Sequence, residues 1–411
     1  MKIKSVEAFL LSYPFRDPVK LEYFGGTRQI LKRDAMLIRV RSEDGTTGYG
    51  PGAASEHWRK RINEEIAPFL YGRVAIEPDA LRVQFQKTEP DAELWKIYCC
   101  VEVALYDLAG KRKGIPVSEF LGGRVRDRIR VYGSSGMYMP PEGYAREAAL
   151  AQKLGFPAYK MRPALGPDGD IRSVELMREA TGISFEIMVD AHTWWRMGDR
   201  SYSLDTVEQV AREMAKFDIT WLEEPILPDN HDGYRKLKEL DIVPLASGEH
   251  EPDEQGFADL LAGCVDYLQM DVVCQGGYSL ARRLFAELQT QELRFAFHSW
   301  GTSLELAAAA QIGICWPDNV VEWLEYPCYS TPEHQFMYEW PLATDICKTQ
   351  FEIVNGEMVV PNGPGLGVEV DESVIERYPW IPGPWSFFTL ISPNETFAVI
   401  SDHSVKWTGK A

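Results

Sequence analysis

Residues 1–127 begin with alternating apolar and polar positions and continue with helical periodicity. The alternation predicts two strands and a hairpin, at Ser5–Pro14, Ala35–Arg41 and 43–50. The later periodicity predicts helices over residues 56–70, 79–88 and 93–113. Strands followed by helices are typical of an α+β domain, so we expect one at residues 1–127.

The pattern changes in residues 128–345, where short apolar runs alternate with amphipathic helical stretches. Eight runs read as buried strands: Ile129–Tyr132, Ala158–Lys160, Ile187–Asp190, Thr220–Glu223, Val243–Gly248, Tyr267–Met270, Phe295–His298 and Val320–Leu324. Eight strands separated by helices are what a (β/α) TIM barrel requires. The fold class expected here is therefore α/β.

The last segment, residues 346–411, gives a weaker pattern. The stretch Val354–Pro361 reads as a hairpin, and we expect it to pack back on the N-terminal domain. The last thirty or so residues are rich in Trp, Pro and Phe and show no clear periodicity.

Composition and charge limit the kinds of partner and the cellular compartment that we expect for this protein. A net charge of -18 argues against nucleic acid or an anionic membrane as the partner, but not against a small anionic substrate at a local site. The chain has no apolar run long enough to span a bilayer, and its start lacks a signal-peptide pattern. Seven cysteines without CxxC spacing indicate reduced thiols in a cytoplasmic enzyme.

Polar residues recur where the predicted barrel strands end, which is the edge that carries the active site in this fold. In strand order they are Lys160 and Arg162, Asp190 and His192, Glu223, Glu249 and His250, Asp271, His298, and Glu322 with Glu325 nearby. From one strand to the next, these residues are about one βα unit apart. We therefore expect all of them to meet at one end of the barrel, which forms its mouth.

Asp190, Glu223 and Glu249 fall on three adjacent strands. Three facing carboxylates repel one another, and a hard divalent cation relieves that repulsion. Mg²⁺ fits best, because it accepts a few carboxylates and keeps positions for water or substrate. The alternative is that each acid only caps the next helix.

Asp271 and His298 end neighbouring strands and suggest a carboxylate–imidazole pair. The Asp would fix the tautomer of the ring and raise its basicity. The alternative for His298 is a packed or capping side chain.

In this order, these residues resemble the enolase superfamily, specifically its mandelate racemase-like branch. Three further stretches carry the resemblance: Val101-Glu-Val-Ala-Leu-Tyr-Asp-Leu-Ala-Gly-Lys, Ile115-Pro-Val-Ser-Glu-Phe-Leu-Gly-Gly and Pro364-Gly-Leu-Gly-Val-Glu. The match extends to about Arg377. It implies an N-terminal capping domain, completed by C-terminal residues, that closes over a modified barrel, with Mg²⁺ at the three acids and an enolate intermediate.

The resemblance also implies roles for single residues. His298 would be the base over the α-carbon, and Lys160 a cation beside the substrate carboxylate. Glu322 would be the strand-eight acid, protonated through a raised pKa so that it can donate a hydrogen bond to that carboxylate. Glu325 is the competing assignment. The expected partner is a small acid sugar, and the expected assembly is a homo-oligomer.

Arg162 departs from the family pattern, in which strand two ends Lys-x-Lys and the second Lys is an opposing base. A guanidinium stays protonated, so it is a poor base and a good anion clamp. The Asp-x-His ending at His192 resembles galactonate and mannonate dehydratases, where the His protonates the leaving hydroxyl. His250 is a weaker candidate for contact with a substrate hydroxyl, and His192 alternatively only lines the mouth.

The segment 21–28 lies between the first two predicted strands and is a candidate lid. Gly25 and Gly26 would hinge it, and Tyr23 or Arg28 would reach substrate hydroxyls. The alternative is a plain turn.

Together, these residues favour a Mg²⁺-dependent dehydratase that converts an aldonate or aldarate to a 2-keto-3-deoxy acid. The first rival is an epimerase, a racemase or a lactone cycloisomerase that uses the same enolate. The second is a non-catalytic metal-binding barrel, against which the Asp271–His298 pair counts.

Overall fold

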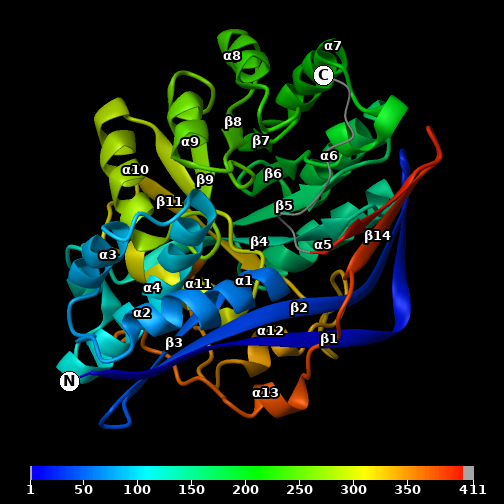
Figure 1. Ribbon diagram of the computed structural model, residues 1–411. Coiled ribbons are helices and arrows are strands. Elements are labelled where there is room, and N and C mark those ends of the chain that lie inside the picture. Colours follow the sequence, from blue (N-terminus) through cyan, green and yellow to red (C-terminus); the bar gives the residue numbers. More distant parts are fainter. Residues whose placement is uncertain (1, 401–411) are drawn as a thin grey trace.

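Figure 1 shows the computed structural model of the chain, which describes residues 2–400. The N-terminal part forms an antiparallel sheet with helices on one side, and the middle of the chain forms a barrel ringed by helices. None of the helices in this range is both long and apolar enough to cross a membrane. All seven cysteines are free.

The capping domain contains three N-terminal strands, β1 (Ile3–Tyr23), β2 (Gly26–Ser42) and β3 (Thr47–Gly52). Its helical elements are α1 (Glu56–Arg61), the π-turn η1 (Ile62–Ile66), α2 (Ala67–Leu70), α3 (Pro78–Gln86), α4 (Ala92–Lys113) and the short η2 (Val117–Phe120). Asp91 caps α4 by accepting a hydrogen bond from Leu94 N, and Gly114 ends it in the left-handed region. The predicted strands and helices of this domain are confirmed, but β1 and β2 are longer than predicted.

The barrel has all eight predicted strands in parallel, and the pairing of the last with the first closes it. The strands are β4 (Arg128–Met137), β5 (Ala158–Arg162), β6 (Glu186–Asp190), β7 (Trp221–Glu223), β8 (Leu245–Ser247), β9 (Tyr267–Met270), β10 (Arg294–Phe297) and β11 (Val321–Pro327). The surrounding helices are α5 (Pro141–Lys153), α6 (Pro167–Thr181), α7 (Leu204–Met214), α8 (His231–Glu239), α9 (Glu254–Leu261), α10 (Gly277–Gln291) and α11 (Ser303–Gly313). Short turns are η3 (Trp194–Arg196), η4 (Gly198–Arg200) and η5 (Ala215–Phe217).

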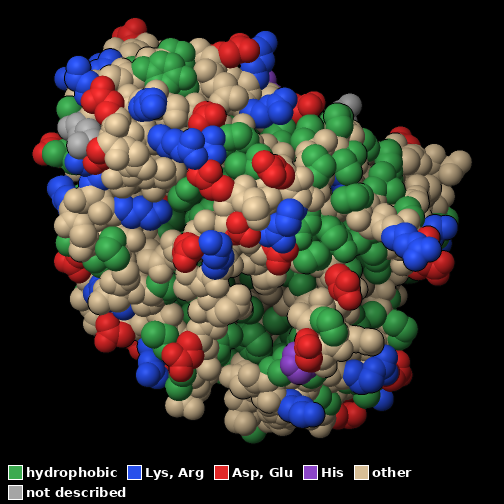
Figure 2. All heavy atoms as spheres, turned by 90° about the horizontal axis from the view of Figure 1, so that it is seen from below, with side chains coloured by type: hydrophobic (Ala, Val, Ile, Leu, Met, Phe, Trp, Pro, Cys, Tyr) green, Lys and Arg blue, Asp and Glu red, His purple; other side chains and the backbone are tan. Residues whose placement is uncertain are grey.

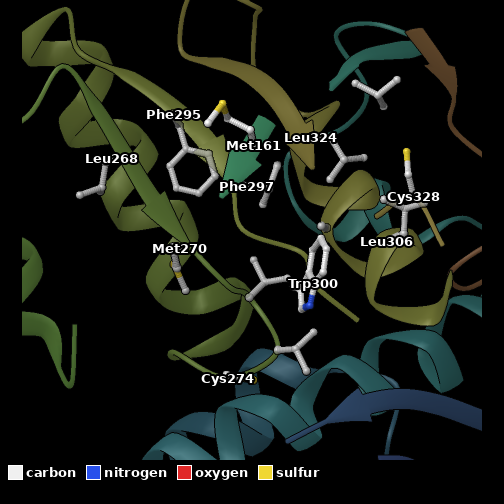
Figure 3. Close-up of a cluster of buried hydrophobic side chains, with 14 of the residues drawn as sticks. Met161, Leu268, Met270, Cys274, Phe295, Phe297, Trp300, Leu306, Leu324 and Cys328 are labelled. Carbon is white, nitrogen blue, oxygen red and sulfur yellow. The ribbon is translucent and has the colours of Figure 1, made fainter. Parts of the chain in front are cut away.

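The core lies between the barrel strands and their helices and continues to the capping domain. Figure 3 shows outward side chains of β9, β10 and β11, such as Leu268, Phe295 and Leu324, in one cluster. Trp300 and Cys274 belong to the same cluster, near the helices of the capping domain. Apolar packing therefore helps to fix the loops after β9 and β10, where the candidate base and its partner lie.

The C-terminal segment divides between the two parts. The hairpin of β12 (Ile353–Val354) and β13 (Glu357–Val359) forms as predicted, but it pairs with β4 of the barrel rather than with the N-terminal domain. The start of β4 extends below its barrel neighbours and offers free backbone groups to β13. After the short α12 (Leu342–Asp345) and α13 (Val374–Arg377), strands β14 (Ser386–Leu390) and β15 (Thr396–Val399) join the capping sheet beside β2. C-terminal residues thus complete the capping domain.

Residues 21–28 form the tip of the long β1–β2 hairpin rather than a free loop. The tip lies against the barrel loops, where Phe24 N donates to Ala164 O at 2.7 Å and Arg200 donates to Phe24 O at 2.7 Å. A side chain at Gly25 would collide with Met197, so this position requires glycine for close approach. The glycine pair serves the turn, and its role as a hinge stays a prediction.

Candidate active site

The interior of the barrel is built in layers, because alternate residues of each strand point inward. The lower layer is largely aromatic and apolar and comprises Tyr132, Ala158, Met188, Trp221, Ala246, Tyr267, Ala296 and Trp323. Two residues further along each strand the layer is polar, except for Gly248: Ser134, Lys160, Asp190, Glu223, Gln269, His298 and Glu325. An apolar floor therefore closes the polar mouth from below.

Lys160 is fully buried and surrounded by acids. Its Nζ lies 2.8 Å from Glu223, 3.1 Å from Glu325 and 3.5 Å from Asp190. Burial alone would lower the pKa of this lysine, but the charges of Glu223 and Glu325 outweigh it and raise the pKa well above its ordinary value. Lys160 is therefore a fixed cation in the mouth of the barrel.

Arg162 is equally well held. Its Nε lies 3.1 Å from Asp190 Oδ2, one terminal nitrogen lies 3.2 Å from Glu325 Oε1, and the guanidinium stacks 3.8 Å from the Trp300 ring centre. Burial would lower its pKa, but Asp190 and Glu325 outweigh burial and raise it. Position 162 holds a permanent charge, as predicted from the residue type.

Glu322 does not reach the site. Its carboxylate pairs with Arg130 and Arg294, each at 2.9 Å, and accepts a hydrogen bond from Tyr267. The register of β11 shifts against β10 at this point, which leaves Glu322 at the amino end of the barrel. The prediction that Glu322 is the strand-eight acid of the active site is therefore wrong.

Glu325 is the strand-eight acid at the mouth. It accepts hydrogen bonds from Ser134 Oγ at 2.6 Å and Ser299 N at 2.8 Å, besides its contacts with the two cations. Burial alone would raise its pKa, but Lys160, His298 and Arg162 outweigh burial and lower the pKa to about 2. This acid is ionised, contrary to the raised pKa expected for a strand-eight proton donor.

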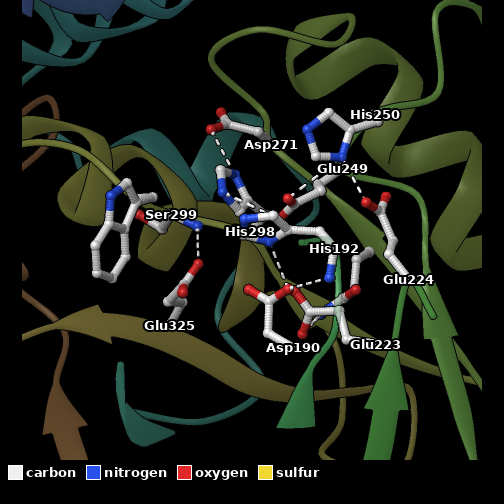
Figure 4. Close-up of polar contacts among 12 residues, drawn as sticks. Asp190, His192, Glu223, Glu224, Glu249, His250, Asp271, His298, Ser299 and Glu325 are labelled. Atoms are coloured by element: carbon white, nitrogen blue, oxygen red, sulfur yellow. Dashed lines mark hydrogen bonds and ion pairs between the residues drawn. The ribbon is translucent and has the colours of Figure 1, made fainter. Parts of the chain in front are cut away.

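Several carboxylates gather beside these cations (Figure 4). Both Glu223 oxygens are occupied, one by Lys160 and the other by Trp221 Nε1 at 3.0 Å and Gln269 Nε2 at 2.8 Å. Burial, followed by the Asp190 charge, raises the pKa of Glu223 to about 8, which reflects mutual repulsion. Among residues 2–400, the one group with ligand atoms all within 4.8 Å is Glu224, Glu249 and His250.

The acids fit a divalent cation. In this acid cluster, three buried carboxylate oxygens receive no hydrogen bond from the described residues: Asp190 Oδ2, Glu224 Oε1 and Glu249 Oε2. Several buried carboxylates that share a few cationic partners are costly, and oxygen donors of this kind are the ligands of hard cations. The predicted ligands Asp190 and Glu249 belong to this set. For strand four the structure adds Glu224, a neighbour of Glu223 that the sequence reasoning missed, as a competing ligand.

Asp271 and His298 form the predicted pair. Asp271 Oδ2 lies 3.2 Å from His298 Nδ1, and Asp271 Oδ1 accepts from Val273 N at 2.7 Å, which holds the carboxylate in place. Nε2 of His298 lies 3.2 Å from Glu249 Oε2. Burial would lower the pKa of His298, but Glu249 and Asp271 outweigh burial and raise it well above its ordinary value.

His192 and His250 flank the acids on the other side (Figure 4). His192 Nδ1 lies 2.6 Å from Asp190 Oδ1, and burial lowers the pKa of the ring to about 3. His250 lies between Glu224, 2.6 Å from its Nδ1, and Arg196, 3.0 Å from its Nε2. Both histidines are thus brought to the site, with their Nδ1 atoms facing carboxylates.

One cavity connects these residues with the capping domain. Its lining includes Arg162, His192, Glu249, His250 and His298 from the barrel. From the capping domain it includes Arg28, Trp385 and Phe388. His298, Trp300 and Trp385 also border a second hollow, on the side of Arg33 and Glu305. The first cavity holds most of the candidate chemistry.

The family follows from comparison with known proteins. Residues 143–374 match the family described as enolase C-terminal domain-like, and residues 7–122 match the mandelate racemase / muconate lactonizing enzyme N-terminal domain. The chain belongs to the enolase superfamily. Within it, the chain falls in the mandelate racemase-like branch.

Individual relatives extend over nearly the whole chain. D-galactarolactone cycloisomerase of Agrobacterium fabrum is 28% identical over 397 residues, 92% of this chain and 99% of the relative. D-xylonate dehydratase of Haloferax volcanii is 27% identical and covers 84% of this chain and 85% of its own. The structure of a putative mandelate racemase from Bordetella bronchiseptica superimposes with a TM-score of 0.82 at 26% identity, covering 93% and 99% of the two chains.

Besides Glu224, the sequence reasoning missed four residues of this enolase-superfamily site, namely Arg196, Trp300, Trp385 and Phe388. Arg196 and Trp300 closely follow His192 and His298. Their position in loops directly after predicted strand ends is the signal that could have identified them. Trp385 and Phe388 lie in a segment without periodicity, and only the pairing of β14 with β2 brings them to the cavity.

Proposed function

We propose that the protein is a Mg²⁺-dependent dehydratase that converts an acid sugar, an aldonate or an aldarate, to a 2-keto-3-deoxy acid. The observation that carries the proposal is that the Asp271–His298 pair and His192 meet around the acid cluster, where His298 and His192 line one cavity with Arg162 and Glu249. A base, a second imidazole and fixed cations within one cavity are the parts that α-proton removal and loss of a β-hydroxyl require.

His298 Nε2 takes the α-proton when the ring is neutral, after it has lost the proton that Glu249 and Asp271 favour. Asp271 holds Nδ1 and so keeps the ring oriented. The electrons of the broken C–H bond form the enolate, whose second negative charge lies near Lys160 and Arg162. Collapse of the enolate expels the β-hydroxyl, which leaves as water with a proton from His192. Because burial keeps His192 neutral in the substrate-free protein, that proton has to be taken up with the substrate.

Asp190, Glu223 and Glu249 are the proposed ligands of the metal ion, which when bound stabilises the ene-diolate as a Lewis acid. Glu223 is preferred to Glu224 because it points into the same barrel layer as Asp190 and Lys160. Glu224 instead starts the following loop with a positive φ of 43° and faces His250. Titration calorimetry with Mg²⁺ should show affinity lost in Glu223→Gln and largely kept in Glu224→Gln. The reverse order would assign the site to Glu224.

The activity is tested by incubating the metal-loaded protein with a panel of acid sugars and assaying 2-keto acids. A product lighter than the substrate by one water identifies a dehydratase. No turnover of any acid sugar, with Mg²⁺ bound, would contradict the proposal.

A second candidate is a lactone cycloisomerase, favoured by the relative from Agrobacterium fabrum, of which the chain covers 99%. The same proton removal would then expel a ring oxygen, and the product would keep the mass of the lactone. Assaying each acid sugar both in its open form and as its lactone distinguishes the dehydratase reaction from the cycloisomerase reaction.

A further inference from the structure

Arg28 is a buried cation for which the described chain supplies no acid. Its side chain is 4% exposed, yet among residues 2–400 no carboxylate lies within ion-pair distance of its guanidinium. By contrast, Arg162, which also lines this cavity, contacts two carboxylates, and Lys160 beside it contacts three.

The contacts that Arg28 does make are weak substitutes for an anion. Its Nε donates to Ser386 Oγ at 3.1 Å, and one terminal nitrogen lies 3.6 Å from Met137 S. The guanidinium lies 4.8 Å and 4.7 Å from the ring centres of Trp385 and Phe388. Cation–π contacts recover part of the cost of burying a charge, but an anion recovers more. The rings fix the guanidinium at the wall of the cavity.

A second cation and a free hydrogen-bond donor lie near Arg28. Arg196 lines the same cavity, and burial, together with the nearby charge of Arg28, lowers its pKa. The buried hydroxyl of Tyr23 has no hydrogen-bond partner within residues 2–400, and both arginines act on it electrostatically. With Arg162, three arginines line the described cavity, against the carboxylate of Glu249.

We propose that Arg28, with Arg196 and Tyr23, binds a second carboxylate, which makes the substrate a dicarboxylate sugar acid: an aldarate or its monolactone. This rests on the proposed function, in which the reacting carboxylate lies at the acid cluster. The neutral hydroxymethyl end of an aldonate would leave Arg28 uncompensated.

The test compares six-carbon aldarates with aldonates of the same configuration, open and as lactones, on the metal-loaded enzyme. We expect kcat/KM to favour the dicarboxylate, and Arg28→Gln to reduce that preference by about tenfold to a hundredfold, the range for a charged hydrogen bond. Activity toward the aldonate should fall by a smaller factor than activity toward the aldarate. Arg28→Lys should keep an intermediate preference, since it keeps the charge without the two-nitrogen geometry.

Arg212→Gln is the matched control, because it removes an exposed arginine on α7, and its preference should equal that of the parent. Calorimetric binding of the same pairs separates the two claims. Preferential binding of dicarboxylates that Arg28→Gln abolishes supports this inference even if no acid is turned over. Turnover of aldonates in preference to aldarates, an unchanged preference in folded Arg28→Gln, or tighter binding of a 6-phosphoaldonate would overturn it.

Discussion

At the scale of single residues, the site consists of charges that are held by opposite charges. Lys160 and Arg162 share Asp190 and Glu325, so each of these buried carboxylates is paired with two cations. Glu325 is ionised for the same reason. In the substrate-free protein this acid is a counter-ion that positions the two cations, and it is not a proton donor.

Glu325 and Glu322 provide a matched pair, since they lie three residues apart on β11 at opposite ends of the barrel. Glu325→Gln should lower kcat on the order of a hundredfold, because it loosens both cations. Glu322→Gln should leave kcat nearly unchanged and lower the free energy of unfolding by about 1–2 kcal/mol, through lost pairing with Arg130 and Arg294. Steady-state rates and urea unfolding measure the two effects. Equal losses of kcat would contradict the assignment.

The Asp271–His298 pair makes a second prediction. His298→Asn should lower kcat by about 10²–10⁴-fold, the usual contribution of a general base, with the substrate dissociation constant changed only slightly. Asp271→Asn should lower kcat less, because it misorients the ring without removing it. Rates and calorimetric binding are the readouts. Near-normal kcat in His298→Asn would refute the assignment of His298 as the base.

At the scale of elements, the sequence was most informative where short apolar runs are separated by helices. All eight barrel strands could be predicted, because each one is a short apolar run that can be recognised within its own stretch of sequence. Strands β14 and β15 could not, because they exist through pairing with β2, far away in sequence. The register shift in β11 is likewise a property of neighbouring strands, and it is why Glu322 was preferred to Glu325.

The contact of α4 with α10 ties the capping domain to the barrel and makes a third prediction. Glu102 on α4 accepts from Ser279 N at 3.0 Å and from Ser279 Oγ at 2.9 Å, at the start of α10. Burial raises the pKa of Glu102 from 4.5 to about 7, so the folded state binds this proton more tightly than the unfolded state does. Its contribution to stability is complete below about pH 4.5 and is lost as the pH rises through about 7.

Glu102→Gln should therefore gain stability relative to the parent between pH 5 and pH 8, by up to about 3 kcal/mol. Parallel urea unfolding of both proteins across this range gives the difference. A difference that stays flat or reverses with pH would show that the carboxylate is ionised in the folded protein throughout.

At the scale of the whole molecule, the cavity forms only because two parts of the chain meet. The barrel supplies the acids, imidazoles and two cations, whereas the capping domain supplies Arg28, Trp385 and Phe388. Figure 2 shows acidic and basic side chains intermixed over the face seen from below, without a field of one sign. The three arginines that line the described cavity, Arg28, Arg162 and Arg196, are thus a local feature in a chain of net charge -18.

The central claim is that this cavity removes the proton next to a carboxylate. The most direct measurement is exchange of the α-hydrogen of acid sugars in D₂O, followed by NMR with the Mg²⁺-loaded protein. Since His298 is the one base and Arg162 stays charged, exchange should occur for one C2 configuration and not its epimer, and should stop in His298→Asn or with a chelator. Comparable exchange into both epimers would reveal a second base and favour an epimerase, and no exchange for any acid sugar, aldarates included, would contradict the account.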